Sequence, residues 1–238
     1  HTFYPYGYLY DEHNSTTGKI TQRRLGEFHL VYTLSPPSLA NTDTIMAIID
    51  TGVDYTHPDL ADYCISGYDF VNNDDDPMDD NGHGTHCAGI AKNNHASIMP
   101  LKALSSYGSG YVSNIILAIN YAKANGVYVC NCSYGSQSYS QAEYDAIAAA
   151  SPMIFVCAAG NNGVNIDTSP HYPAAYQLDN IIAVAAVDNA NNLAYFSNYG
   201  KISVDIGAPG VNITSTYLGG GYASMSGTSM AAPFVTKI

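Results

Sequence analysis

The stretch TIMAIIDTGVDYTHPDL (residues 44–60) passes directly from an unbroken apolar run to a polar turn that contains glycine. An apolar run of strand length, without alternating polar residues, is typical of a parallel strand that is buried on both faces. Asp50 is the last residue of this run. The stretch therefore predicts a carboxylate at the carboxyl end of a buried parallel strand.

Similar apolar runs recur along the chain and predict further strands of the same sheet. They are ASIMPLKAL, GVYVCNCS, PMIFVCAAG and NIIAVAAV, within residues 96–104, 126–133, 152–160 and 180–187. Between them, residues 112–125 have apolar side chains at helical spacing, with Gly126 as the stop, and residues 139–150 predict a second helix. Alternating strands and helices indicate an α/β fold with a doubly wound, mostly parallel sheet. The ligand site of such a sheet lies at the carboxyl ends of its strands.

The first 40 residues differ in composition from the rest of the chain. Residues 1–40 are rich in Tyr, Pro, Gly and Thr and have no helical or strand periodicity, which predicts an irregular N-terminal arm. Residues 41–238 contain all the predicted strands and helices. We therefore expect one α/β domain over residues 41–238, with the arm in front of it.

The charge balance excludes several classes of partner. The chain of 238 residues has 20 acidic and 8 basic side chains, for a formal net charge of −12, and 46% of its residues are hydrophobic. This apolar content indicates a globular protein. Sequence-independent binding to the phosphates of a nucleic acid requires clustered Lys and Arg side chains, so no nucleic-acid partner is expected. No apolar run is long enough to cross a bilayer, so no membrane partner is expected either.

The five cysteines do not have the spacing of a small disulfide scaffold, and their number is odd. Cys130 and Cys132 alternate along a predicted strand, which places both side chains on one face. Without a second such pair, core packing is favoured over a metal site. The cysteine count does not settle the compartment.

Three polar clusters stand where an α/β sheet places its site. Asp50 ends a strand, His83 begins a helix in DDNGHGTHCAGI, and Ser229 begins a helix in SMSGTSMAAP. A carboxylate can orient an imidazole, the imidazole can take the proton of a hydroxyl, and the hydroxyl oxygen can then attack a carbonyl carbon. Taken singly, each residue has a simpler explanation. Asp50 could be a turn residue. His83 and His86 could be two ligands of a metal ion, although no third ligand is evident. Ser229 could be an ordinary serine at a helix N-terminus.

Taken together and in this order, four motifs resemble the subtilisin-like serine proteases, the subtilase family. They are DTGVDYTHPDL, NGHGTHCAGI, AAGNNG and SGTSMAAP, and the likeness runs from about Ile45 to Phe234. Their style is that of the thermitase-like members that carry a cysteine after the second motif histidine. The resemblance implies a subtilisin-like fold and makes residues 41–238 the catalytic domain.

The resemblance also implies the catalytic roles. Asp50 would orient the imidazole, His83 would be the general base and then the general acid, and Ser229 would be the nucleophile. Asn161, at the end of FVCAAGN, would donate a hydrogen bond to the oxyanion, together with the backbone N–H of Ser229 at its helix N-terminus. The alternative for Asn161 is a turn residue before Asn162.

Members of this family hold a peptide as an added strand between two extended segments. The matching residues here are Ser106, Tyr107, Gly108, Ser109 and Gly110 on one side, and Ser133, Tyr134, Gly135, Ala158, Ala159 and Gly160 around the pocket for the residue before the scissile bond. His171 falls at the floor of that pocket, where it would shorten the pocket or favour a polar partner, or else it lies at the surface. Leu104, Val112 and Ile115 suit either apolar subsites or core packing.

The segment YDFVNNDDDPMDD gathers hard oxygen ligands in one loop. Asp69, Asp74 and Asp76 suit a structural Ca²⁺ ion, as in a similar loop of thermitase-like relatives, or a solvated acidic loop. No cofactor is expected for catalysis.

Cys87, next to His86, would make activity sensitive to mercurials.

These observations predict a secreted, monomeric serine endopeptidase that acts on peptides or proteins through an acyl-enzyme on Ser229. The secreted location follows from a first residue that is His1 rather than Met, and from the family's maturation from secreted precursors. Members of the family continue well beyond the nucleophile helix, whereas this chain has nine residues after Ser229. The alternative is therefore a catalytically inactive peptide-binding or structural fragment, truncated at its C-terminus.

Overall fold

A computed structural model describes residues 44–237, so the predicted irregular arm of residues 1–40 lies outside the described part of the chain. The elements are β1 Thr44–Asp50, β2 Tyr68–Asp69, α1 His83–Ala91, β3 Ala96–Lys102, α2 Val112–Ala124, β4 Val129–Cys132, α3 Gln141–Ala149, β5 Ile154–Ala158, β6 Ile181–Val187, β7 Ile206–Pro209, β8 Ile213–Tyr217, the 3-10 turn Leu218–Gly220, β9 Gly221–Met225 and α4 Thr228–Thr236.

The central sheet has the order β2-β3-β1-β4-β5-β6-β7, and each neighbouring pair in it is parallel. Strands β3 and β4 flank β1 on opposite sides, so the strand order reverses at β1. A reversal of this kind leaves a crevice at the carboxyl ends of the strands. The predicted doubly wound, mostly parallel sheet is confirmed, and Asp50 lies at the carboxyl end of the strand where the order reverses.

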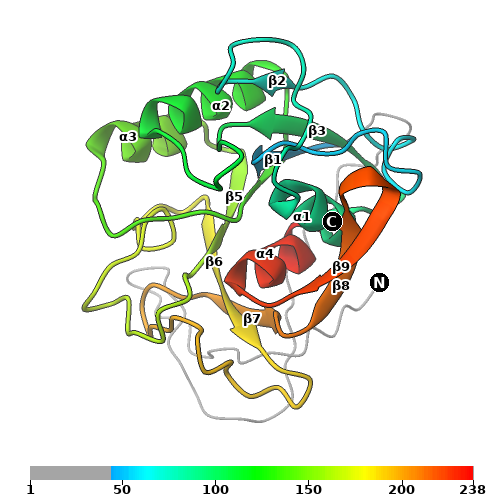
Figure 1. Cartoon of the computed structure of the whole chain (residues 1–238). Coiled ribbons are helices and arrows are strands. Elements are labelled where there is room, and N and C mark those ends of the chain that lie inside the picture. The colour runs from blue at the N-terminus through cyan, green and yellow to red at the C-terminus, as the bar shows by residue number, and fades with distance from the viewer. Residues whose placement is uncertain (1–43, 238) are drawn as a thin grey trace.

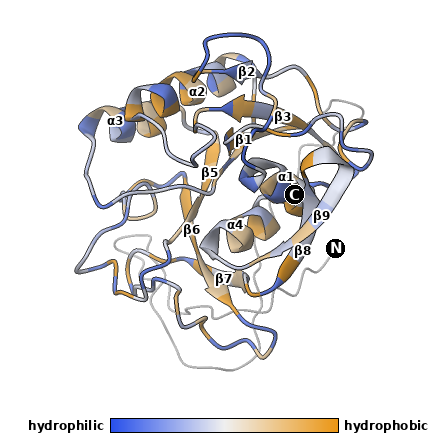
Figure 2. Cartoon of the chain, in the orientation of Figure 1, coloured by the Kyte–Doolittle hydropathy of each residue, from blue (hydrophilic) through white to orange (hydrophobic). Residues whose placement is uncertain are grey.

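Helices cover both faces of this sheet (Figure 1). Helices α2 and α3 pack on one face, and α1 and α4 on the other. Alternate residues of β1 point to opposite cores: Ile49 packs with Ile119 of α2, whereas Ile48 packs with Met230 of α4. This two-sided burial is the physical reason for the unbroken apolar run, and Figure 2 shows the central strands as largely hydrophobic. Within residues 44–237, no helix has the length and apolarity to cross a bilayer.

The predicted helices are confirmed with small shifts at their ends. Helix α2 ends where expected, because Gly126 adopts a positive φ of 73° after its last turn. Helix α3 begins two residues later than predicted, since Ser140 is its N-cap and accepts a hydrogen bond from the backbone N–H of Glu143.

All five cysteines are free thiols. Cys130 and Cys132 both point into the core that lies under α2 and α3, as their alternation along β4 predicts. The Sγ atom of Cys130 lies 3.7 Å from the Met153 sulfur. Cys130 and Cys132 therefore pack in the core, as the sequence favours.

Candidate active site

Asp50 and His83 form the centre of the candidate site. Asp50 ends β1 with a fully buried side chain, and its Oδ1 lies 2.7 Å from Nδ1 of His83, the first residue of α1. A side chain at Gly84 would collide with the carbonyl oxygen of Gly52, so glycine is what lets α1 approach the turn after Asp50 this closely. The motif glycine thus sets the carboxylate–imidazole distance.

Two opposing effects act on the proton affinity of His83. Its burial lowers the pKa, and the nearby charge of Asp50 raises it, with the net result that the pKa stands well above the ordinary value of 6.5. The second carboxylate oxygen, Oδ2 of Asp50, is buried and accepts no hydrogen bond from residues 44–237. The Asp50 carboxylate therefore interacts with two groups, the His83 imidazole and the backbone N–H of Thr51.

Ser229 enters the same crevice from α4. Its Oγ donates to the carbonyl oxygen of Ser133 over 3.0 Å, and the Ser133 hydroxyl donates back to the Ser229 carbonyl oxygen over 2.8 Å. The Cys87 thiol lies 4.0 Å from Nδ1 of His83 and 3.4 Å from the Ser229 carbonyl oxygen, so it links the two helices. In this structure the Ser229 hydroxyl is hydrogen-bonded to Ser133 rather than to His83. Catalytic hydrogen bonds commonly tighten only when substrate is bound.

Asn161 follows β5 and is oriented by a residue that the sequence interpretation missed. Its Oδ1 accepts hydrogen bonds from the backbone N–H of Thr228 over 2.8 Å and from the Thr228 hydroxyl over 3.0 Å, which leaves Nδ2 pointing away. A Cβ atom placed on Gly227 would lie 3.6 Å from Nδ2 of Asn161 and 3.7 Å from the backbone nitrogen of Ser229. The side-chain amide and the Ser229 N–H therefore border the same small space, as two donors to one oxyanion must.

A cleft of about 450 Å³ opens beside His83. Of the predicted substrate-binding residues, Gly108, Ser109, Gly110, Ser133, Tyr134 and Gly135 line it, as do Leu104, Val112 and Ile115. Leu104 and Ile115 also belong to the core, which confirms core packing for these two residues, while their role as apolar subsites stays a prediction.

Some predicted substrate-binding residues lie elsewhere. Tyr107 is 92% exposed, and neither it nor Ser106 lines the cleft. The Ser106 carbonyl oxygen instead accepts a hydrogen bond from the Asn81 amide. The side chains of Ala158 and Ala159 are buried in the two cores on opposite faces of the sheet. Their contribution to a pocket would come from the backbone, since successive strand residues face opposite ways.

The His171 ring lies between the two glycines that were predicted to wall the pocket for the residue before the scissile bond. A side chain at Gly135 would collide with its Nε2, and a Cβ on Gly160 would lie 2.8 Å from its Cδ2. Its Nδ1 is buried without a hydrogen bond to any residue in 44–237, and burial lowers the pKa of the ring. The His171 ring is therefore partly buried against these two glycines, and its role in the pocket stays a prediction.

Lys102 is the second functional side chain that the sequence interpretation missed. It pairs with Asp50 in the β1–β3 register, and its side chain is only 2% exposed. Its ammonium donates to the carbonyl oxygens of Thr51 over 2.7 Å and Leu104 over 3.1 Å, and lies 2.6 Å from Oδ1 of Asp80. Lys102 thus ties the turn after Asp50 to the cleft wall. The sequence feature that could have identified this residue is a lysine inside an otherwise apolar strand.

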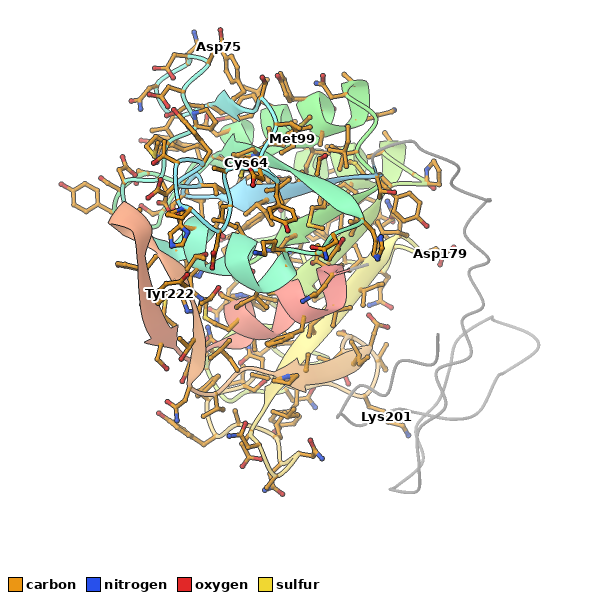
Figure 3. All side chains as sticks on the ribbon, turned by 90° about the vertical axis from the view of Figure 1, so that its right-hand side faces the viewer. Cys64, Asp75, Met99, Asp179, Lys201 and Tyr222 are labelled. Atoms are coloured by element: carbon orange, nitrogen blue, oxygen red, sulfur yellow. The ribbon has the colours of Figure 1, made fainter. Side chains whose placement is uncertain are left out.

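His86, the other histidine of the motif, is a structural residue in this site. Its buried Nε2 lies 3.1 Å from the carbonyl oxygen of Ile213 and 3.0 Å from that of Ala223. It therefore joins α1 to the antiparallel hairpin β8–β9. The hairpin is held further by Tyr222, whose hydroxyl donates to Asp59, and Figure 3 shows Tyr222 on this hairpin.

The structure does not bring the three predicted calcium ligands together. Asp69 is buried and accepts hydrogen bonds from its own loop, at Val71 and Asn72. Asp76 accepts one from the Tyr55 hydroxyl. In the described part of the chain, the group of His, Cys, Asp or Glu side chains close enough to share a metal ion is Asp50, His83 and Cys87. Figure 3 shows Asp75 at the outer tip of the acidic loop. Calcium binding there stays a prediction.

A buried carboxylate on a histidine, a serine at a helix start and a nearby asparagine amide are the groups of a nucleophilic site on an α/β fold. The chain belongs to the subtilase family, whose sequence model matches residues 41–238.

Similar proteins support this assignment. The "Thermophilic serine proteinase" of Bacillus sp. (strain AK1) is 49% identical over 207 residues, which cover 81% of this chain and 50% of that protein. The "Thermitase" of Thermoactinomyces vulgaris is 44% identical over 207 residues, with 81% and 72% covered. A solved structure of "a cold adapted subtilisin-like serine proteinase" superimposes with a TM-score of 0.75 at 33% identity, covering 91% of this chain and 80% of that one. The chain spans about half the length of the first of these relatives.

Proposed function

We propose that this protein is a serine endopeptidase that hydrolyses peptide bonds through an acyl-enzyme on Ser229. The observation that carries the proposal is the shared space beside Gly227, which Nδ2 of Asn161 and the backbone N–H of Ser229 both border. Two donors aimed at one point stabilise the negative oxygen that forms when a carbonyl is attacked. Peptide binding alone does not require such a pair of donors, so the arrangement favours catalysis over a binding module.

The reaction uses the site in two halves. His83, oriented by Asp50, takes the Ser229 proton as the Ser229 oxygen bonds to the carbonyl carbon, and then gives that proton to the leaving amine as the peptide bond breaks. A water molecule repeats the attack on the acyl-enzyme with His83 again as base, which releases the acid and restores Ser229. The Ser229 hydroxyl must first leave its hydrogen bond to Ser133 and turn to His83.

The substrate would lie extended between residues 108–110 and 133–135, the two cleft segments, and pair with their backbones as an added strand. The polypeptide substrate class follows from this mode, because main-chain pairing selects extended chains. We also propose an extracellular location, on the strength of the family to which the chain belongs.

Labelling with phenylmethylsulfonyl fluoride tests the proposal. Mass spectrometry should place one sulfonyl group on Ser229, and labelling should disappear in Ser229→Ala and decline strongly in His83→Ala. Casein and fluorogenic peptides should be cleaved by the wild-type chain alone. A folded sample that binds peptides but neither labels nor cleaves them would refute the proposal in favour of the inactive binding module.

A further inference from the structure

The far end of the cleft contains a buried acidic side chain that the proposed chemistry does not use. Glu143, in the first turn of α3, lines the same cleft as His83 and is only 5% exposed. Apolar side chains, among them Leu104 and Ile115, line the same cleft. A buried acidic group in such a cleft is costly unless something compensates it.

The hydrogen bonds of Glu143 leave half of its carboxyl group unused. Its Oε2 accepts a hydrogen bond from the Tyr176 hydroxyl over 2.9 Å. Its Oε1 accepts none from residues 44–237, yet it is not sealed off from solvent, so its remaining access is through the cleft. The Oε1 atom of Glu143 is therefore a polar group of the cleft that lacks a hydrogen-bond partner among residues 44–237.

Among residues 44–237, no cationic side chain forms an ion pair with Glu143. Within residues 44–237 the ion pairs are His83 with Asp50 and Lys102 with Asp80, and neither involves Glu143. The burial of Glu143 raises the pKa of its carboxyl group, which reflects the missing counter-charge. A bound cation would supply it, since paired charges are what make buried carboxylates tolerable.

We propose that Glu143 makes this end of the cleft a subsite for a cationic substrate side chain, lysine or arginine. The inference rests on the proposed peptidase function and specifies its substrate class. The apolar stem of such a side chain would pack along Leu104 and Ile115, and its charged end would reach Oε1. A formal net charge of −12 would draw cationic peptides toward the protein in addition.

The residue that is recognised here is not the one directly before the scissile bond. Gly160 and His171, which the sequence predicts at the pocket for that residue, do not line the cleft that contains Glu143. Gly135 contacts His171 and also lines this cleft, so the two sites adjoin. Successive side chains of an extended peptide point to opposite sides, so adjoining sites receive side chains of different substrate residues.

The test uses fluorogenic peptides in which each position near the scissile bond carries Lys, Met or Ala in turn. Lys and Met have stems of similar length and differ in charge. At one position the wild-type chain should prefer Lys to Met in kcat/KM by about tenfold, the size of one hydrogen bond to a charged group. Glu143→Gln should bring that ratio close to one, and Glu143→Asp should give an intermediate ratio.

Asp145→Asn is the matched control, because it removes an exposed carboxylate from the same helix. It should leave the Lys-to-Met ratio unchanged. Cleavage of the Ala peptides should be equal in all four proteins, which shows that each variant is folded. An unchanged ratio in Glu143→Gln, or a wild-type preference for Met at every position, would overturn the proposal.

A failure of the peptidase function would be recognisable separately, as absence of cleavage and of Ser229 labelling in the wild-type chain. The subsite is then tested by binding alone. Fluorescence anisotropy of the same labelled Lys and Met peptides should show about a tenfold difference in Kd that Glu143→Gln removes. Equal Kd values for the two peptides on the wild-type chain would refute the subsite.

Discussion

The Nδ1 atom of His83 lies 2.7 Å from Oδ1 of Asp50, and this contact is the main interaction that favours the charged imidazole against its burial. The general base acts only when it is neutral. Because the pKa of His83 is raised, kcat/KM should fall as the pH drops through a midpoint that lies above 6.5.

Asp50→Asn removes the charge that raises the His83 pKa. The midpoint of the kcat/KM profile should move to lower pH, and the plateau should fall by about 10⁴, the order measured for the corresponding aspartate of subtilisin itself. A profile with an unchanged midpoint would contradict the role of the Asp50 charge. Circular dichroism controls for folding.

Asn161→Ala removes the side-chain donor to the oxyanion. We expect kcat to fall by about 10²–10³ with little change in KM, as found for this kind of donor in subtilisin. Thr228→Val removes the hydroxyl that donates to the Asn161 amide oxygen and accepts from the Gly160 N–H, but it keeps the backbone N–H to Oδ1. Its loss in kcat should be smaller than that of Asn161→Ala, about tenfold, the size of one ordinary hydrogen bond. A loss in Asn161→Ala no larger than that in Thr228→Val would contradict the donor role of Asn161.

Mercuric ion should inactivate the protein slowly through Cys87. The thiol lies 4.0 Å from Nδ1 of His83, so a metal atom on its sulfur would displace the imidazole, but burial makes access slow and raises the thiol pKa. Cys87→Ala should remain active and insensitive. Cys64, whose pKa burial raises to about 12, provides the control, since Cys64→Ala should be as sensitive as the wild type.

Lys102→Met keeps the length of the side chain but removes the ammonium. The carbonyl oxygens of Thr51 and Leu104 then lose a donor, at a cost of about 1–3 kcal/mol each when buried. Urea unfolding should show this loss, and KM should rise because Leu104 lines the cleft. Lys123→Met, on the exposed face of α2, should change the free energy of unfolding by less than about 0.5 kcal/mol.

His171→Gly should enlarge the pocket for the residue before the scissile bond. The ring now lies between Gly135 and Gly160, so its removal frees space for an aromatic substrate side chain. We expect kcat/KM for peptides with Phe at that position, relative to Ala, to rise by at least about tenfold. If the ratio of the two substrates stays the same, His171 does not bound this pocket.

Most of the sheet could be predicted from the sequence, because a strand that is buried on both faces needs apolar side chains along most of its length. Strands β1, β3, β4, β5 and β6 are mostly apolar along their length, and Ser97, Lys102 and Asn131 are polar exceptions inside β3 and β4. Strand β2 has two residues and β7 begins with only one large apolar residue, so neither has a readable pattern. The hairpin β8–β9 is held by contacts with other segments, from His86 and from Asp59 to Tyr222.

The sequence by itself determined the fold class and the residues proposed for the chemistry, because long motifs with glycine at the points of close approach need a particular backbone geometry. Only the tertiary structure decided that Thr228 orients Asn161, that Lys102 supports the cleft wall and that Glu143 lines the cleft without a counter-charge from residues 44–237. These relationships join residues from different elements. Hydrogen bonding and desolvation depend on distance in space, and separation along the chain does not fix that distance.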